Sequence, residues 1–96
     1  MTAQETIKNT LLEAAGKFRE LNFAYLYVKH TGTHVVDVTP QDEVDKNIEY
    51  QKWEADFTYE FDKMYFPECV LFITKNSLTK IGIPDFVINP KSKKDG

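Results

Sequence analysis

The sequence predicts a small α+β domain in the order α-β-β-α-β-(short helical turn)-β, with two helices on one face of a three- or four-stranded, largely antiparallel sheet. Three observations lead to this prediction. Apolar residues recur with helical spacing in residues 2–21 and 39–66, alternate with period two in residues 22–38, and form a continuous run at residues 69–74. The length of 96 residues suits one domain, which we place at residues 1–90, with a flexible polar tail at residues 91–96.

The first helix is predicted from its start signal and its apolar stripe. Thr2 and Glu5 have the spacing of a capping box, in which each side chain accepts a bond from the other's backbone N–H. Apolar side chains then recur at helical spacing and predict a face directed toward a core: Ile7, Leu11, Ala14, Phe18 and Leu21.

A β-hairpin is predicted next. Residues 22–29 and 34–38 are rich in β-branched and aromatic side chains, and residues 30–33 contain Gly32 as a turn signal. Both faces of the first strand are apolar, so we expect neither face to be wholly free. One face carries Phe23, Tyr25 and Tyr27, and the other carries Ala24, Leu26 and Val28.

A single long helix over residues 39–66 is the prediction on which the functional interpretation rests. Thr39 is a suitable N-cap, Pro40 fits the first helical position, and Pro67 ends the helix. A strand is the competing interpretation of residues 56–62, but the helical spacing continues for longer. The stripe expected to face the core is Tyr50, Trp53, Phe57, Phe61 and Met64.

A second, weaker stripe lies on roughly the opposite side of this helix. It is either covered by neighbouring elements or forms an exposed contact surface for a partner or a second copy. Its members are Val44, Ile48, Ala55 and Tyr59.

Shorter elements complete the predicted fold. The apolar run at residues 69–74 indicates a buried, central strand. Residues 76–81 predict one helical turn that ends at Gly82, and residues 85–89 predict a short edge strand between prolines.

Charge is distributed unevenly along the chain. The net charge of −3 conceals a balance of −7 over residues 37–62, where nine carboxylates face two lysines. A concentrated acidic surface repels nucleic acid and steers basic partners toward it, although an acidic helix face is often merely solvated. We therefore expect a protein partner with a basic surface, and neither a nucleic acid nor a membrane.

Several kinds of chemistry have no support in the sequence, so we expect no enzyme and no cofactor. The four glycines are scattered singly, and neither Ser77 nor Ser92 has the context of a nucleophile. No signal peptide or membrane-spanning run is apparent, so a cytoplasmic location is expected. Cys69 is the single cysteine and is interpreted as a small buried hydrophobe.

His30 and His34 are the one pair that could bind a metal or titrate together. A three-residue loop would place them opposite each other, whereas a two-residue loop would separate them. The favoured interpretation is two solvent-facing turn histidines. Two ligands and a distant Cys69 do not make a zinc site, and we predict no metal.

These observations favour a small, non-enzymatic protein-binding module that docks its acidic, aromatic helix on a basic partner. By analogy of charge and size alone, inhibitors, immunity proteins and anti-defence proteins work in this way. One alternative is a nucleic-acid-associated protein that uses Tyr25, Tyr27, Lys29 and the tail lysines, and another is a homo-oligomer such as a homodimer. The predicted contact residues are Glu49, Glu54, Asp56, Tyr59, Glu60 and Asp62.

Overall fold

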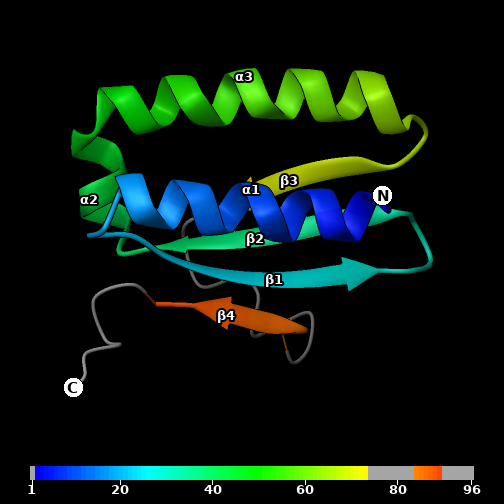
Figure 1. Cartoon of the computed structure of the whole chain (residues 1–96), viewed down its shortest axis with the longest axis horizontal. Coiled ribbons are helices and arrows are strands. Elements are labelled where there is room, and N and C mark those ends of the chain that lie inside the picture. Colours follow the sequence, from blue (N-terminus) through cyan, green and yellow to red (C-terminus); the bar gives the residue numbers. More distant parts are fainter. Residues whose placement is uncertain (1, 74–83, 90–96) are drawn as a thin grey trace.

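The computed structural model of the protein describes residues 2–73 and 84–89. Within these residues the order of elements is α-β-β-α-α-β-β, and the helices pack against a four-stranded mixed sheet. Figure 1 shows α1, α2 and α3 on one side of the strands. The elements are α1 (Ala3–Lys17), β1 (Asn22–Val28), β2 (Thr33–Thr39), α2 (Gln41–Lys46), α3 (Ile48–Tyr65), β3 (Cys69–Ile73) and β4 (Phe86–Ile88).

The strands lie in the order β3-β2-β1-β4. β1 is antiparallel to β2 and to β4, while β2 and β3 are parallel. The prediction of an edge strand near the end of the chain is confirmed for β4, but β3 is an edge strand and the prediction of a central one is wrong. An apolar run predicts a strand without fixing its neighbours, and Leu71 in β3 is 50% exposed. The predicted turn at residues 76–81 and the tail at 91–96 lie outside the described residues.

The first helix forms as predicted. Thr2 and Glu5 make both bonds of the capping box, at 3.0 and 3.1 Å. The helix ends at Lys17, and the Phe18 N–H still bonds to the Ala14 carbonyl oxygen. All five residues of the predicted apolar stripe are buried, which fixes α1 over the sheet.

The β-hairpin is also confirmed, with a longer connection than either loop considered above. Val28 pairs with Thr33, so residues 29–32 form the connection, and Gly32 has a φ of 67° that suits glycine. This register places His34 opposite Tyr27 rather than His30. His30 is exposed, but His34 is completely buried, so the interpretation of two solvent-facing histidines is wrong for His34.

The continuous helix over residues 39–66 does not form, because α2 ends at Lys46 and α3 begins at Ile48. Asn47 separates them with an extended backbone, and its side chain accepts the Tyr50 N–H at 2.9 Å. Asparagine competes with the helix for backbone bonds in this way, which makes it a good cap and a poor interior residue. The cap of α2 is Pro40 rather than Thr39, without a side-chain capping bond within the described residues.

The inner side of α3 supplies much of the aromatic core. Tyr50 and Phe61 are buried, and Trp53 and Phe57 pack partly buried against the same cluster. Met64, predicted to belong to this stripe, is instead 67% exposed. Tyr65 continues the inner side in its place and joins α3 to α1 through a 2.6 Å hydrogen bond between its hydroxyl and that of Thr6.

Candidate functional site

The outer side of α3 carries an exposed apolar stripe. Ile48 and Tyr59 are both 63% exposed, and Ala55 lies exposed between them. Because these residues are seven and four positions apart, they share one side of the helix. We call these three residues the outer stripe. Val44, expected to belong with them, lies in α2 and is buried.

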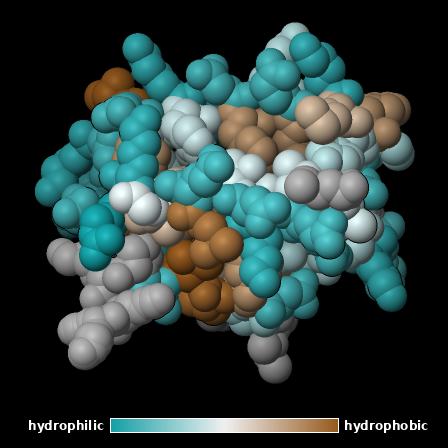
Figure 2. All heavy atoms as spheres, viewed as in Figure 1, coloured by the Kyte–Doolittle hydropathy of each residue, from teal (hydrophilic) through white to brown (hydrophobic). Residues whose placement is uncertain are grey.

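Carboxylates flank the outer stripe along one side. Glu49 pairs with Lys17 at 3.1 Å and Glu60 approaches Lys63 at 3.9 Å, in both cases between exposed side chains. Asp56 is exposed and forms no ion pair within the described residues. Exposed pairs of this kind contribute about 0–1 kcal/mol, so these carboxylates stay accessible to an incoming cation. Figure 2 shows hydrophilic side chains along α3, at the top of the view, with hydrophobic ones toward both ends of the helix.

Two of the predicted contact residues face the protein itself. Glu54 is partly buried, and burial raises its pKa. It lies close to the buried Tyr50, whose own pKa is raised strongly, first by burial and then by this carboxylate. Asp62 accepts the Val70 N–H at 3.1 Å and so holds the start of β3 against α3. Of the predicted residues, Glu49, Asp56, Tyr59 and Glu60 therefore remain on or beside the outer stripe.

A second arrangement surrounds the buried His34 in β2. The Nδ1 atom lies 2.7 Å from the Tyr25 hydroxyl, and the Nε2 atom lies 2.6 Å from a Glu68 carboxylate oxygen. When the imidazole is neutral and Glu68 is ionised, Nε2–H donates to Glu68 and the Tyr25 hydroxyl donates to Nδ1. The pKa of Tyr25 is raised, chiefly by burial and next by Asp85, which keeps its hydroxyl protonated.

Four rings from three strands stack in a row beside this network. The ring centroids of Phe86 and Tyr25 are 4.8 Å apart, those of Tyr25 and His34 are 5.9 Å apart, and those of His34 and Tyr27 are 4.5 Å apart. The interplanar angles are 24°, 20° and 25°. Stacking adds roughly 0.5–1.5 kcal/mol per pair beyond the buried area, so the row is a stiff part of the molecule.

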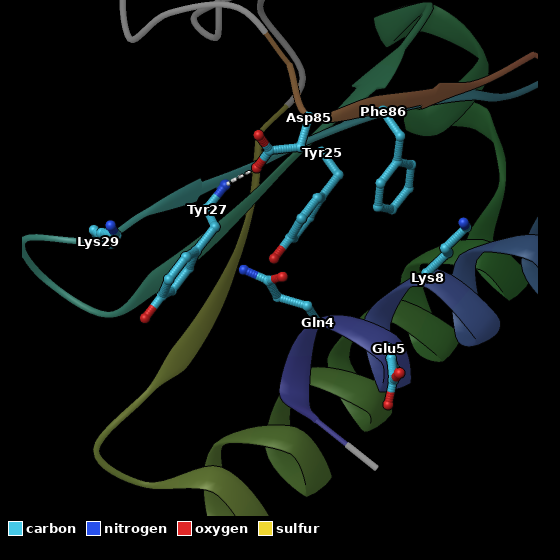
Figure 3. Close-up of a pocket in the computed structure, with 8 residues that line it drawn as sticks. All are labelled: Gln4, Glu5, Lys8, Tyr25, Tyr27, Lys29, Asp85 and Phe86. Carbon is cyan, nitrogen blue, oxygen red and sulfur yellow. Dashed lines mark hydrogen bonds between the residues drawn. The ribbon is translucent and has the colours of Figure 1, made fainter.

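A cavity of about 430 Å³ opens beside this row, between α1, β1 and β4. Figure 3 shows that its lining residues come from three segments that are far apart in the sequence, with Gln4 directed toward the tyrosines and the Glu5 carboxylate directed away from them. We call this cavity the α1–β4 pocket. Its lining residues are Gln4, Glu5, Lys8, Tyr25, Tyr27, Lys29, Asp85 and Phe86.

The sequence indicates some of the residues of the α1–β4 pocket but not the cavity itself. Tyr25, Tyr27 and Lys29 were grouped as an alternative binding surface, and the structure does bring these three together. Gln4, Lys8 and Phe86 reach the same place through tertiary packing, for which the sequence holds no local signal. His34 could have been recognised as inward-facing, because it alternates with the buried Val36 and Val38.

Neither a cluster of metal ligands nor a membrane-spanning helix is present in the part of the chain that the structure describes. Nowhere in it do three His, Cys, Asp or Glu side chains gather to hold a metal ion. None of its helices is both long enough and apolar enough to cross a membrane. Cys69 is partly buried, with its Sγ atom 3.9 Å from the Thr33 hydroxyl.

Comparison with known proteins gives no relative from which a function could be transferred. No protein-family model, no curated protein and no solved structure matches this chain. The geometry of the outer side of α3 and of the α1–β4 pocket is therefore the basis for a functional proposal.

Proposed function

We propose that the protein is a non-enzymatic protein-binding module that docks the outer side of α3 on a basic surface of another protein. The observation that carries this proposal is the outer stripe together with the carboxylates of Glu49, Asp56 and Glu60 beside it. A site that joins exposed apolar area to charge of one sign is typical of surfaces that bind a complementary partner.

The helix is well suited to present this surface because its inner side is anchored. Tyr50 and Phe61 are 0% and 2% exposed and lie among aromatic neighbours. A partner would therefore meet a largely preformed helix, and little conformational entropy would be lost on binding. Covering Tyr59 would add the apolar contact that large aromatic residues provide at the centres of interfaces.

The charges define the chemistry of the partner. Its surface should have an apolar hollow for Tyr59 and Ile48, with lysine or arginine side chains along the edge that meets Asp56 and Glu60. These cations would replace the weak internal pairs of Glu49 and Glu60. The balance of −7 over residues 37–62 would also accelerate encounter at low ionic strength.

Proteins that act on nucleic acids have basic surfaces of this kind, which supports an inhibitor of such a protein as the specific version of the proposal. The support comes from charge complementarity alone, since a fold does not determine a function. In this version the acidic helix occupies a surface that otherwise holds phosphates.

The test is affinity capture from the native host with a charge-reversed variant. Asp56→Lys combined with Glu60→Lys should abolish capture of the partner while leaving the circular dichroism spectrum unchanged. Glu13→Lys combined with Glu20→Lys is the matched control, because both residues are exposed and neither belongs to α3. Equal capture by the wild type and the α3 variant would refute the proposal, as would equal losses in the variant and its control.

Self-association would show a different use of the same surface. Light scattering of the purified protein measures it directly, and substitution of Tyr59 by alanine should then return the protein to a monomer. A dimer that depends on Tyr59 would replace the basic partner with a second copy of this chain.

A further inference from the structure

We propose that the α1–β4 pocket binds a nucleotide, with its planar base against the aromatic side chains and its phosphate on Lys29. The proposal rests on the meeting of three kinds of group in one cavity: stacked rings, polar side chains that both donate and accept, and lysine ammonium groups. A volume of about 430 Å³ lies within the range of about 300–1,000 Å³ that small-molecule sites occupy.

Three aromatic side chains, Tyr25, Tyr27 and Phe86, form one wall of the pocket. Tyr27 and Phe86 are partly buried members of the four-ring row, so both are held in place and both still line the pocket. Tyr25, between them, is fixed by its hydrogen bond to His34. Planar bases stack on such rings with roughly 1–3 kcal/mol per base, whatever the base.

Polar side chains, including Gln4 and Asp85, form another edge of the pocket. Figure 3 shows Gln4 reaching from α1 into the pocket toward the two tyrosines. Asp85 accepts the Tyr27 N–H at 3.0 Å through Oδ2, and Glu5 accepts the Thr2 N–H through Oε1. Asp85 thus has one oxygen placed by a backbone bond and a second oxygen as a further acceptor, whereas Figure 3 shows the Glu5 carboxylate directed away from the tyrosines. A base edge carries donors and acceptors together, which suits this combination of amide and carboxylate.

The position of the phosphate follows from the two lysines, which lie at opposite ends of the pocket in Figure 3. The Lys8 ammonium lies 5.8 Å from the centre of the Phe86 ring and has this cation–π contact. Lys29 is exposed and has neither a carboxylate nor a ring partner among the described residues. Lys29 is therefore the cation with an unused charge, and an anionic group is the natural ligand for it.

A nucleotide matches all three features, whereas simpler ligands match fewer. An inorganic phosphate would leave the aromatic wall unused, and a neutral aromatic ring would leave Lys29 unused. A free aromatic amino acid could place its ammonium on Asp85 or Glu5, so it is the strongest competitor. The nucleotide could come from the free pool or from the end of a single strand, and these sources share the same chemistry.

This site is separate from the proposed docking surface. The pocket is built by α1, β1 and β4, while the outer stripe lies on α3, so neither proposal depends on the other.

The experiment is isothermal titration calorimetry of the full chain with nucleoside monophosphates, a 5′-phosphorylated trinucleotide, inorganic phosphate and aromatic amino acids. A nucleoside monophosphate should bind, and Lys29→Glu should weaken it by about tenfold or more, because one phosphate contact becomes repulsive. Lys52→Glu is the control with the same charge change, since Lys52 is exposed on α3 outside the pocket. It should change the affinity by less than about twofold.

Each other result has a defined meaning. Equal binding of the monophosphate and the trinucleotide identifies a site for one terminal nucleotide, while binding of the monophosphate alone identifies a free ligand. Absence of nucleotide binding at millimolar concentration overturns the proposal. So does binding of aromatic amino acids in place of nucleotides, or equal affinity of the wild type and the Lys29 variant.

Discussion

The hydrogen bond between Tyr25 and His34 should make a measurable contribution to stability. Its atoms are 2.7 Å apart, and the two residues are 1% and 0% exposed. Replacing Tyr25 by phenylalanine removes the hydroxyl and leaves the buried Nδ1 atom without that partner, at a cost of about 1–3 kcal/mol. For a domain of this size, a loss of 2 kcal/mol lowers the midpoint of thermal unfolding by roughly 8–16 °C.

A double-mutant cycle separates the bond from the loss of packing. His34→Phe should cost more than Tyr25→Phe, because it leaves the Tyr25 hydroxyl buried without its acceptor and also removes the bond to Glu68. The double variant places two phenylalanines side by side and leaves neither member of this bond unpaired, so it should cost less than the sum of the two single effects; the lost Glu68 bond is common to His34→Phe and the double variant and cancels in the cycle. The expected coupling is therefore about 1 kcal/mol or more in favour of the double variant.

The assay is urea unfolding followed by Trp53 fluorescence and by circular dichroism, which together test two-state behaviour. Tyr59→Phe is the matched control, because its hydroxyl belongs to a side chain that is 63% exposed and its removal should change stability by less than about 0.5 kcal/mol. Single effects that add within about 0.5 kcal/mol in the double variant would refute the reasoning. Such additivity would mean that the coupling free energy between Tyr25 and His34 is close to zero.

Two further predictions concern carboxylates of α3. Asp62→Ala should destabilise the protein by about 1 kcal/mol, because the Val70 N–H loses its acceptor. Capture of the partner should stay equal to that of the wild type. An unchanged urea unfolding curve would contradict this structural role. Glu54→Gln should stabilise the protein near pH 7, because burial raises the pKa of Glu54 and so makes its ionised form costly when folded. That cost is absent below the pKa of the unfolded carboxyl, about 4.3, so the gain should vanish at lower pH. Thermal unfolding from pH 3 to pH 8 measures it, and a gain that is independent of pH would contradict the explanation.

The sequence predicts elements well where the signal is local. The capping box of Thr2 and Glu5 and the apolar spacing that follows define α1 without reference to the rest of the chain. The alternation in residues 22–38 defines the hairpin for the same reason, although its register depends on the connection. Because that connection is longer than expected, the register places His34 opposite Tyr27 rather than His30, and the sequence pattern of the turn alone could not show this.

The break at Asn47 shows the limit of periodicity. The aromatic spacing after Tyr50 belongs to α3 and the acidic start belongs to α2, so each half of the prediction describes a real helix. Asparagine is favoured at helix caps but also occurs inside helices. Which of the two positions it occupies depends on whether the chain must turn there. α2 contacts both β2 and α3, and its Val44 is buried in the core, so the position of α2 depends on tertiary packing.

The position of β3 depends on non-local pairing in the same way. Its apolar residues would suit a strand with neighbours on both sides, yet it pairs within the described residues with β2 alone. Parallel pairing requires a long connection, and α3 provides it by returning the chain to the same end of the sheet. The residues of β3 themselves do not indicate this connection or the strand with which β3 pairs.

The candidate site was partly predictable because a helix has two sides. Charge alone placed Glu54 and Asp62 with the contact residues, but both lie toward the buried flank of α3, where one is desolvated and the other bonds to β3. Asp56 and Tyr59 lie on the outer side and carry little of the internal packing. Their substitution can therefore remove a partner without unfolding the helix that presents it. This separation lets capture measurements test the docking surface itself, and it makes α3 a structural element on one side and a candidate recognition element on the other.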